Sequence, residues 1–240
     1  MCIAINSPKG TTPKKESLKE SFKNNPHGGG FAFVDDGKII IKKGFMDFNK
    51  FFRAYNDANL QSKNKLIHFR IKTSGKINYE NCHPFMVTDK LAMIHNGVIP
   101  NFGNDKISDT REFISMVLAP IIKENGLEVL TNQTFIETMR DLIGSSKLVF
   151  LDNKGKSYII NETLGHYNCD VWFSNSSYKS YNTDTIGNYK SYYNESYYFD
   201  DVNCDECGMI LDTSFDGSIC EFCTEENERK APQRWYFHRN

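Results

Sequence analysis

Four cysteines near the C-terminus have the spacing of a metal site. Cys204, Cys207, Cys220 and Cys223 form two C-x2-C pairs that are twelve residues apart. In a sequence with no secretion signal, two thiolates on each of two tight turns favour tetrahedral zinc over disulfides. The alternative is a redox C-x-x-C motif, which does not usually occur doubled at this spacing. Because cysteine fills all four ligand positions, we expect a closed, structural zinc ribbon with no metal-bound water.

Cys2 could act as an N-terminal nucleophile. It directly follows the initiator Met, so removal of Met1 would leave one residue that carries both a thiol and a free α-amine. An α-amine titrates near ~7.7 to 8.0 and can accept the thiol proton at neutral pH. The alternative is that Cys2 is a small core residue of a first strand, which is the commoner role of a cysteine there.

Short apolar segments and amphipathic segments alternate from residue 1 to about residue 174. Nine segments have the length and composition of strands. They are CIAI, GFAFV, KIIIKK, KLIHFRI, PFMVT, LAMIH, KLVFLD, KSYIIN and DVWFS. Helical spacing is present at 14–22, 48–58, 110–122 and 134–143, with Ser108 or Asp109 as a candidate cap of the third helix. Short connections between strands favour antiparallel sheets with helices packed on them, so the predicted fold class is α+β.

The composition limits the possible functions and locations. The 240 residues are 39% hydrophobic, which is enough for a core, and carry a formal net charge of −1. Such a chain has no global field that would attract nucleic acid or an anionic membrane. No apolar run reaches the ~18 residues of a membrane span, and the apolar start is too short for a signal peptide. We therefore expect a cytoplasmic protein with no nucleic-acid or membrane partner.

A polar tract divides the chain. Residues 176–200 are rich in Tyr, Ser and Asn and cannot supply a core of their own. They predict a linker between a main domain at 1–175 and the zinc ribbon at 201–226, which a tail at 227–240 follows. The alternative is an arm whose tyrosines pack on the main domain.

Several motifs together resemble those of a known enzyme family. They are NPHGGGFAF at 25–33, HFRIKTSG at 68–75, NCHPF at 81–85, MIHNG at 93–97, SDT at 108–110 and VWFSNSSY at 171–178. In this order, behind a Cys at position 2, they resemble class II glutamine amidotransferases of the N-terminal nucleophile hydrolase superfamily. The resemblance covers residues 2–178 and implies a four-layer αββα sandwich of antiparallel sheets.

The resemblance implies roles for the matched residues. Cys2 would attack the glutamine amide, and the Asn96 side chain with the Gly97 N–H would form the oxyanion hole. Arg70 would bind the α-carboxylate of glutamine and Asp109 its α-ammonium. From the residues alone, Arg70 could also be a solvent-facing strand residue and Asp109 only a helix cap.

Two further residues complete the predicted site. The resemblance adds Thr73 and His95 to the residues around the substrate. We expect His95 and His83 to order the site rather than to act as bases, because the α-amine already supplies a base. Lys72, Ser74 and Gly29 depart from the family pattern, which puts the specificity in question more than the chemistry.

The predicted function is glutamine hydrolysis that releases ammonia for an unidentified acceptor. The chain has no G-x-x-x-x-G-K-[ST] motif, and residues after 175 offer no acceptor-activating domain. We therefore expect a separate synthase or another protein partner, zinc as a structural metal and no organic cofactor. Two alternatives stay open: a hydrolase of γ-glutamyl amides in a larger metabolite, and a non-catalytic zinc-ribbon binding module with a vestigial amidotransferase domain.

Overall fold

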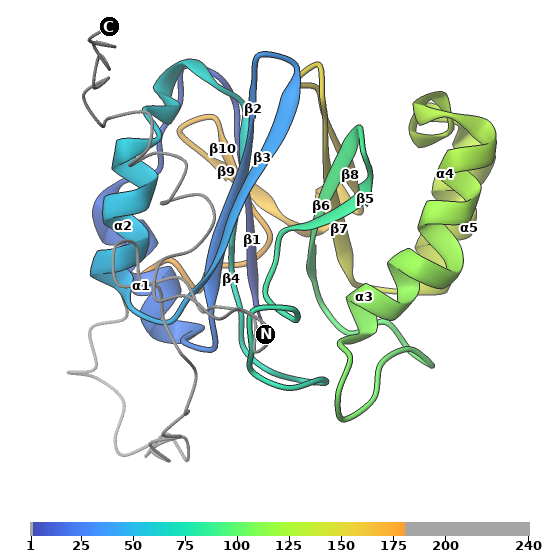
Figure 1. Cartoon of the computed structure of the whole chain (residues 1–240), viewed down its shortest axis with the longest axis horizontal. Helices are drawn as coiled ribbons and strands as arrows, with labels where there is room; N and C mark the ends of the chain where they lie inside the picture. The colour runs from blue at the N-terminus through green and yellow to red at the C-terminus, as the bar shows by residue number, and fades with distance from the viewer. Residues whose placement is uncertain (1, 181–240) are drawn as a thin grey trace, which may run out of the picture.

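The protein forms four layers in a computed structural model that describes residues 2–180 (Figure 1). Two antiparallel sheets pack face to face, and helices cover the outer face of each sheet. The predicted antiparallel sheets are confirmed, and the layers are consistent with the αββα sandwich. The predicted zinc ribbon with Cys204, Cys207, Cys220 and Cys223, and the tail, lie outside the described residues.

The larger sheet has six strands in the order β3-β2-β4-β1-β10-β9. Its strands are β1 (Ile3–Ser7), β2 (Gly29–Asp35), β3 (Lys38–Phe45), β4 (Lys65–Phe69), β9 (His166–Asn168) and β10 (Val171–Phe173). All were predicted except β9, which is only three residues long. A two-residue turn, Cys169-Asp170, joins it to β10, and both turn residues have positive φ (49° and 62°).

The smaller sheet has four strands in the order β5-β6-β7-β8, all antiparallel. The strands are β5 (Phe85–Thr88), β6 (Leu91–Asn96), β7 (Lys147–Asp152) and β8 (Ser157–Ile160). Each matches a predicted strand. The apolar layer between the two sheets includes Ala4, Ile94 and Trp172.

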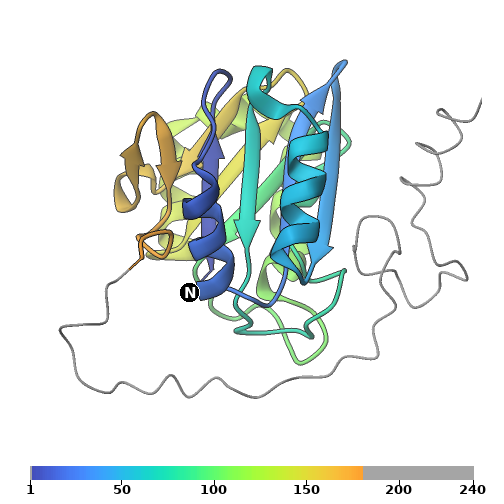
Figure 2. The same cartoon turned by 90° about the vertical axis from the view of Figure 1, so that its left-hand side faces the viewer.

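Helices cover both outer faces. The helices α1 (Lys15–Asn24) and α2 (Phe48–Asp57) lie side by side on the six-stranded sheet (Figure 2). Four helical segments pack on the other sheet: α3 (Asp109–Phe113), a π-helix (Ile114–Leu118), α4 (Ala119–Asn125) and α5 (Gln133–Ile143). Short 3₁₀ helices occur at Leu60–Ser62, Leu127–Thr131 and Glu162–Leu164.

The predicted helix at 110–122 is present but is not uniform. It divides into α3, the π-helix and α4. Pro120 stands near the start of α4 and has no N–H to donate to the carbonyl four residues before it, so the regular α-helical pattern is interrupted there. Between residues 2 and 180, no helix has the length and apolar character needed to cross a membrane.

Strand alternation places Cys2 opposite Asn96. Ala4 of β1 and Ile94 of β6 both belong to the apolar layer between the sheets. Because every second residue of a strand faces the same side, Cys2 and Asn96 also face this layer, at one of its ends. The Asn96 side chain donates a hydrogen bond to the Cys2 carbonyl, so the two residues meet across the sheets.

Candidate active site

The Cys2 thiol lies directly before the first residue of β1. Its sulfur lies 3.3 Å from both the amide nitrogen and the carbonyl oxygen of Ile71, which follows β4. The Cys2 carbonyl accepts hydrogen bonds from the side-chain amides of Asn96 and, at 2.7 Å, Asn175. In Figure 1 this end of the molecule is the lower one, where the loops after β4 and β6 lie.

The net effect of the surroundings is to raise the pKa of the Cys2 thiol, so they do not favour the thiolate. Burial raises the pKa of Cys2, whereas the hydrogen bond with Ile71 and the positive charge of Arg70 lower it, and the charge of Asp109 raises it. Within residues 2–180, no histidine hydrogen-bonds to this sulfur. A nucleophilic Cys2 therefore needs a base other than an imidazole.

Arg70 is buried and wrapped by its own loop. Only 3% of it is exposed, so the alternative of a solvent-facing strand arginine is wrong. Its guanidinium donates to the carbonyls of Lys76 and Ser74 at 2.8 and 2.7 Å. A guanidinium has five N–H donors, so donors remain to bind a carboxylate.

Asp109 lies at the start of α3 with its carboxylate fixed by backbone amides. One oxygen accepts from Ile99 N and the other from Thr110 N, each at 2.8 Å. Of the two candidate caps, Ser108 is the N-cap residue, and its hydroxyl accepts from Arg111 N at 3.4 Å. The buried Asp109 carboxylate therefore keeps acceptor capacity for a ligand such as an ammonium group.

Hydrogen bonds join the loop that carries Arg70 to the loop before Asp109. Asn81 donates to the carbonyl of Lys106 at 2.8 Å and accepts from Ser108 N at 3.0 Å. Asp109 N donates to the Ser74 hydroxyl at 3.1 Å. These bonds set the relative positions of the two charged groups. Sequence reasoning missed Asn81 as a positioning residue, although the NCHPF motif contains it.

Gly97 follows β6 in a conformation that requires glycine. Its φ is +143°, and a Cβ there would lie 2.1 Å from the Ser146 hydroxyl. The backbone therefore turns tightly beside Asn96, as an oxyanion-hole amide would need. Thr73 is exposed on the loop after β4, and its contact with substrate stays a prediction.

His95 belongs to a buried histidine cluster behind the site. Its Nδ1 lies 2.9 Å from the hydroxyl of Thr110, which also lies 3.2 Å from His83 Nε2. The ring of His68 lies 4.0 Å from that of His83, centroid to centroid. Sequence reasoning did not identify Thr110 as the residue that links the two histidines.

The histidine cluster is neutral at physiological pH. Burial lowers the pKa of His68 to about 3 and that of His95 to about 4, and it lowers the pKa of His83 well below the ordinary value. The ordering role expected of His83 and His95 stays a prediction. A direct contact of His95 with substrate stays a prediction.

The start of the polar tract packs on the domain. Besides the bond from Asn175 to Cys2, the Tyr178 ring stacks on Phe173 with centroids 4.0 Å apart, and its hydroxyl lies 3.1 Å from His166 Nε2. Sequence reasoning missed Asn175, although the VWFSNSSY segment contained it. The tract from residue 181 onward lies outside the described residues.

No metal site is present in the part of the chain that the structure describes. Within residues 2–180, no three His, Cys, Asp or Glu side chains are placed to hold a metal ion. The cysteines in this part, Cys2, Cys82 and Cys169, are free thiols. The four cysteines of the predicted zinc site all follow residue 180, so that site stays a prediction.

Comparisons with known proteins give relatives for the main domain. No protein-family model matches the chain. The chain is 32% identical over 159 residues to the isomerizing glutamine–fructose-6-phosphate aminotransferase of Pyrococcus horikoshii. This alignment covers 60% of this chain and 26% of the relative. The chain is 26% identical over 168 residues to the aminotransferase of the same name from Agrobacterium fabrum. This alignment covers 68% of this chain and 25% of the relative.

A solved structure is similar to the chain at lower identity. The glutamine phosphoribosylpyrophosphate amidotransferase of B. subtilis, complexed with ADP and GMP, is 19% identical with a TM-score of 0.49, over 72% of this chain and 41% of that one. The chain spans about a quarter of the length of the two aminotransferases. Over its aligned part, the chain is similar to these glutamine–fructose-6-phosphate aminotransferases.

Proposed function

We propose that this chain hydrolyses the side-chain amide of glutamine with Cys2 as the nucleophile. The observation that carries the proposal is the convergence at one end of the sandwich. Asn96 contacts Cys2 directly, and the charges of Arg70 and Asp109 lie close enough to Cys2 to change its pKa in opposite directions. A zwitterionic substrate with a neutral amide needs a cation, an anion and oxyanion donors around one nucleophile.

The proposed reaction has two steps. After removal of Met1, the α-amine of Cys2 accepts the thiol proton while the sulfur attacks the amide carbon. The second N–H of the Asn96 amide and the Gly97 N–H stabilise the oxyanion, and the proton leaves with the amide nitrogen as ammonia. Water then attacks the γ-glutamyl thioester, which releases glutamate and restores the thiol.

One orphaned atom supports a ligand at this position. The side-chain oxygen of Asn96 is buried and has no hydrogen-bond partner within the described residues. Buried polar atoms are normally hydrogen-bonded. A bound amide or the processed N-terminus would supply a donor where Asn96 already contacts Cys2.

Replacing the charged binders should weaken substrate binding more than catalysis. We expect Arg70→Ala and Asp109→Ala to raise KM for glutamine, because each removes a charge-assisted contact that is worth about 1.5–3 kcal/mol in the ground state and the transition state alike. Steady-state kinetics of ammonia release measures this effect. A drop in kcat with an unchanged KM would remove the binding roles of both residues.

Comparison of kcat/KM for free glutamine and for γ-glutamyl amides tests which of the two is the substrate. The site would bind the glutamyl end of free glutamine and of a γ-glutamyl amide in the same way, through Arg70 and Asp109. We propose free glutamine, because the relatives carry glutamine in their names. A kcat/KM that is higher for γ-glutamyl amides of larger metabolites would favour the alternative hydrolase.

We further propose that the ammonia passes to an acceptor on a partner protein and that the zinc ribbon contacts this partner. Full-length protein should bind about one zinc per chain at Cys204, Cys207, Cys220 and Cys223. Because so small a ribbon is expected to fold only with its metal, Cys204→Ser should release the zinc while glutamine hydrolysis continues. Metal analysis beside ammonia assays measures both, and Cys82→Ser is the matched control that should keep the zinc.

Truncation tests whether the segment after residue 180 docks on a partner or completes the glutamine site. A chain that ends after residue 180 keeps the Asn175 and Tyr178 contacts, and we expect it to keep glutamine turnover. If this truncated protein stays folded but loses turnover, the segment after residue 180 completes the glutamine site and the docking role is wrong.

A further inference from the structure

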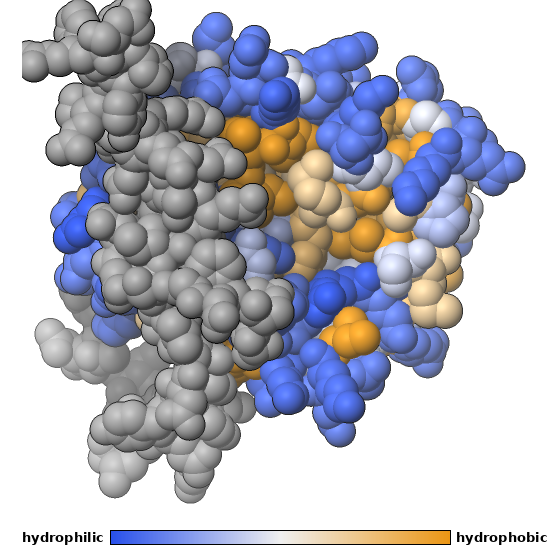
Figure 3. Space-filling view, in the orientation of Figure 1, coloured by the Kyte–Doolittle hydropathy of each residue, from blue (hydrophilic) through white to orange (hydrophobic). Residues whose placement is uncertain are grey.

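A pocket that does not include Cys2 lies at the edges of the two sheets. It has a volume of about 570 Å³ and is lined by residues of β3, of the segment before β5, of β5 itself, of α3 and of the π-helix. None of the residues assigned above to glutamine binding or catalysis lines it. In the orientation of Figure 1, apolar side chains gather in the middle of this face between hydrophilic ones (Figure 3).

Lys43 brings a buried positive charge to the pocket. The residue is only 9% exposed, and its ammonium lies 4.5 Å from the ring centroid of Phe85 and 4.9 Å from that of Tyr79. Within residues 2–180 its ammonium forms no salt bridge and no hydrogen bond. The charge of Glu80 acts on this ammonium but forms no ion pair with it, so the buried charge lacks the close anionic partner that normally accompanies it.

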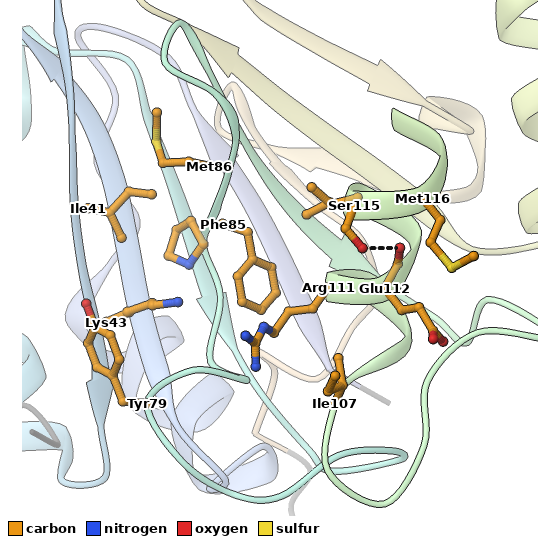
Figure 4. Close-up of a pocket in the computed structure, with 12 residues that line it drawn as sticks. Ile41, Lys43, Tyr79, Phe85, Met86, Ile107, Arg111, Glu112, Ser115 and Met116 are labelled. Atoms are coloured by element: carbon orange, nitrogen blue, oxygen red, sulfur yellow. Dashed lines mark hydrogen bonds between the residues drawn. The ribbon is translucent and has the colours of Figure 1, made fainter. Parts of the chain in front are cut away.

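Arg111 adds a second cation at the same pocket. Figure 4 shows its guanidinium below the Phe85 ring and the Lys43 ammonium to the left of that ring, so that the two cations point toward one another. The Arg111 guanidinium donates to the Asn81 amide oxygen at 3.4 Å and has no carboxylate partner within the described part of the chain. Two cations that face the same space repel each other unless an anion lies between them.

The one carboxylate in the pocket lining does not fill this role. Glu112 accepts a hydrogen bond from Gly103 N at 2.5 Å. Figure 4 shows its carboxylate turned away from Lys43, beyond Arg111. The rest of the pocket lining includes apolar side chains, among them Phe85, Met86 and Ile114.

We propose that this pocket binds a small organic anion, in which a carboxylate or phosphate group lies between Lys43 and Arg111 and an apolar body packs on Phe85 and Met86. The two cations would bind the charged group by charge-assisted hydrogen bonds. The apolar walls would bind the body of the ligand and would favour such a molecule over a free inorganic ion.

Benzoate and phenyl phosphate are suitable probes, with benzamide as a neutral probe of similar shape. Calorimetric titration of the full-length protein at fixed ionic strength should show saturable binding of at least one anion, about tenfold or more tighter than benzamide, as expected for hydrogen bonds to charged groups. The tighter of the two anions identifies the charged group. Equal affinity for benzamide, or no saturable binding of either anion, would overturn the proposal.

Matched substitutions test the two cations. Lys43→Met and Arg111→Gln should each weaken anion binding about tenfold or more, whereas Lys90→Met removes an exposed charge outside the pocket and should leave it unchanged. Lys43→Met should also keep or raise the thermal stability, because it removes a buried charge that has no partner. If all three variants fold and bind the anion alike, the proposed site is wrong. If Lys43→Met does not fold, the anion affinity of Arg111→Gln alone decides the test.

The pH dependence provides a second readout. Burial lowers the pKa of Lys43 to about 8, and the groups that face it are Arg111, Glu80 and Cys82. Burial raises the pKa of Cys82 to about 11, so this thiol does not ionise in the same range. Anion affinity should therefore fall between pH 7 and pH 9 in the natural protein, as Lys43 loses its proton, and this fall should be absent in Lys43→Met.

Discussion

Replacing Cys2 with alanine should reduce ammonia release from glutamine by about 10⁴-fold or more, because the reaction loses its only nucleophile. Cys82→Ala and Cys169→Ala are the matched controls and should leave turnover nearly unchanged. Burial raises the pKa of Cys82 to about 11, and Cys169 is exposed in the turn between β9 and β10. Ammonia release by the three variants measures the difference.

The fold of the Cys2→Ala variant must be checked beside its activity. The backbone carbonyl of Cys2 still accepts from Asn96 and Asn175 in this variant, so we expect thermal unfolding close to that of the natural protein. A folded Cys2→Ala protein that still releases ammonia would exclude Cys2 as the nucleophile. A Cys82→Ala variant that is folded but inactive would move the chemistry to the second buried thiol.

Asn96→Ala should lower kcat for glutamine by about 10²- to 10³-fold, with a small change in KM, because one oxyanion donor acts mainly in the transition state. The structure offers a matched control in Asn175→Ala. Both side-chain amides donate to the Cys2 carbonyl, but only Asn96 is next to Gly97. The control therefore removes a contact that positions Cys2 and leaves the proposed oxyanion hole intact.

The comparison of the two asparagine variants separates stabilisation of the oxyanion from positioning of Cys2. We expect Asn175→Ala to lower kcat much less than Asn96→Ala does. Equal losses in kcat would show that Asn96 acts only by holding the Cys2 backbone. An unchanged kcat in Asn96→Ala would remove the oxyanion role altogether.

The sequence was sufficient to predict most of the elements that carry the site. β1, β4 and β6 are mostly apolar segments of strand length, so their patterns identified them. β9 has only three residues, two of them exposed, and no apolar alternation identifies so short a strand. The π-helix was not predicted either, because helical spacing does not distinguish it from an α-helix.

The positions of the proposed site residues in the fold were predictable because their motifs lie at the ends of predicted strands and helices. Arg70 follows β4, Asn96 ends β6, and Asp109 begins α3. The contact between Asn175 and Cys2 joins residues 173 apart, and no local pattern indicates such a partner. The pocket at Lys43 and Arg111 also depends on tertiary packing, since β3 and α3 are distant in the sequence.

The most direct test of the proposed chemistry is the intact mass of the natively expressed protein before and after treatment with a chloroketone analogue of glutamine. We expect a chain without Met1 that gains one molecule of the analogue at Cys2. We expect no adduct in Cys2→Ala or in protein that keeps Met1. Adduct formation and full glutamine turnover by protein that keeps Met1 would contradict the role of the Cys2 α-amine as the base.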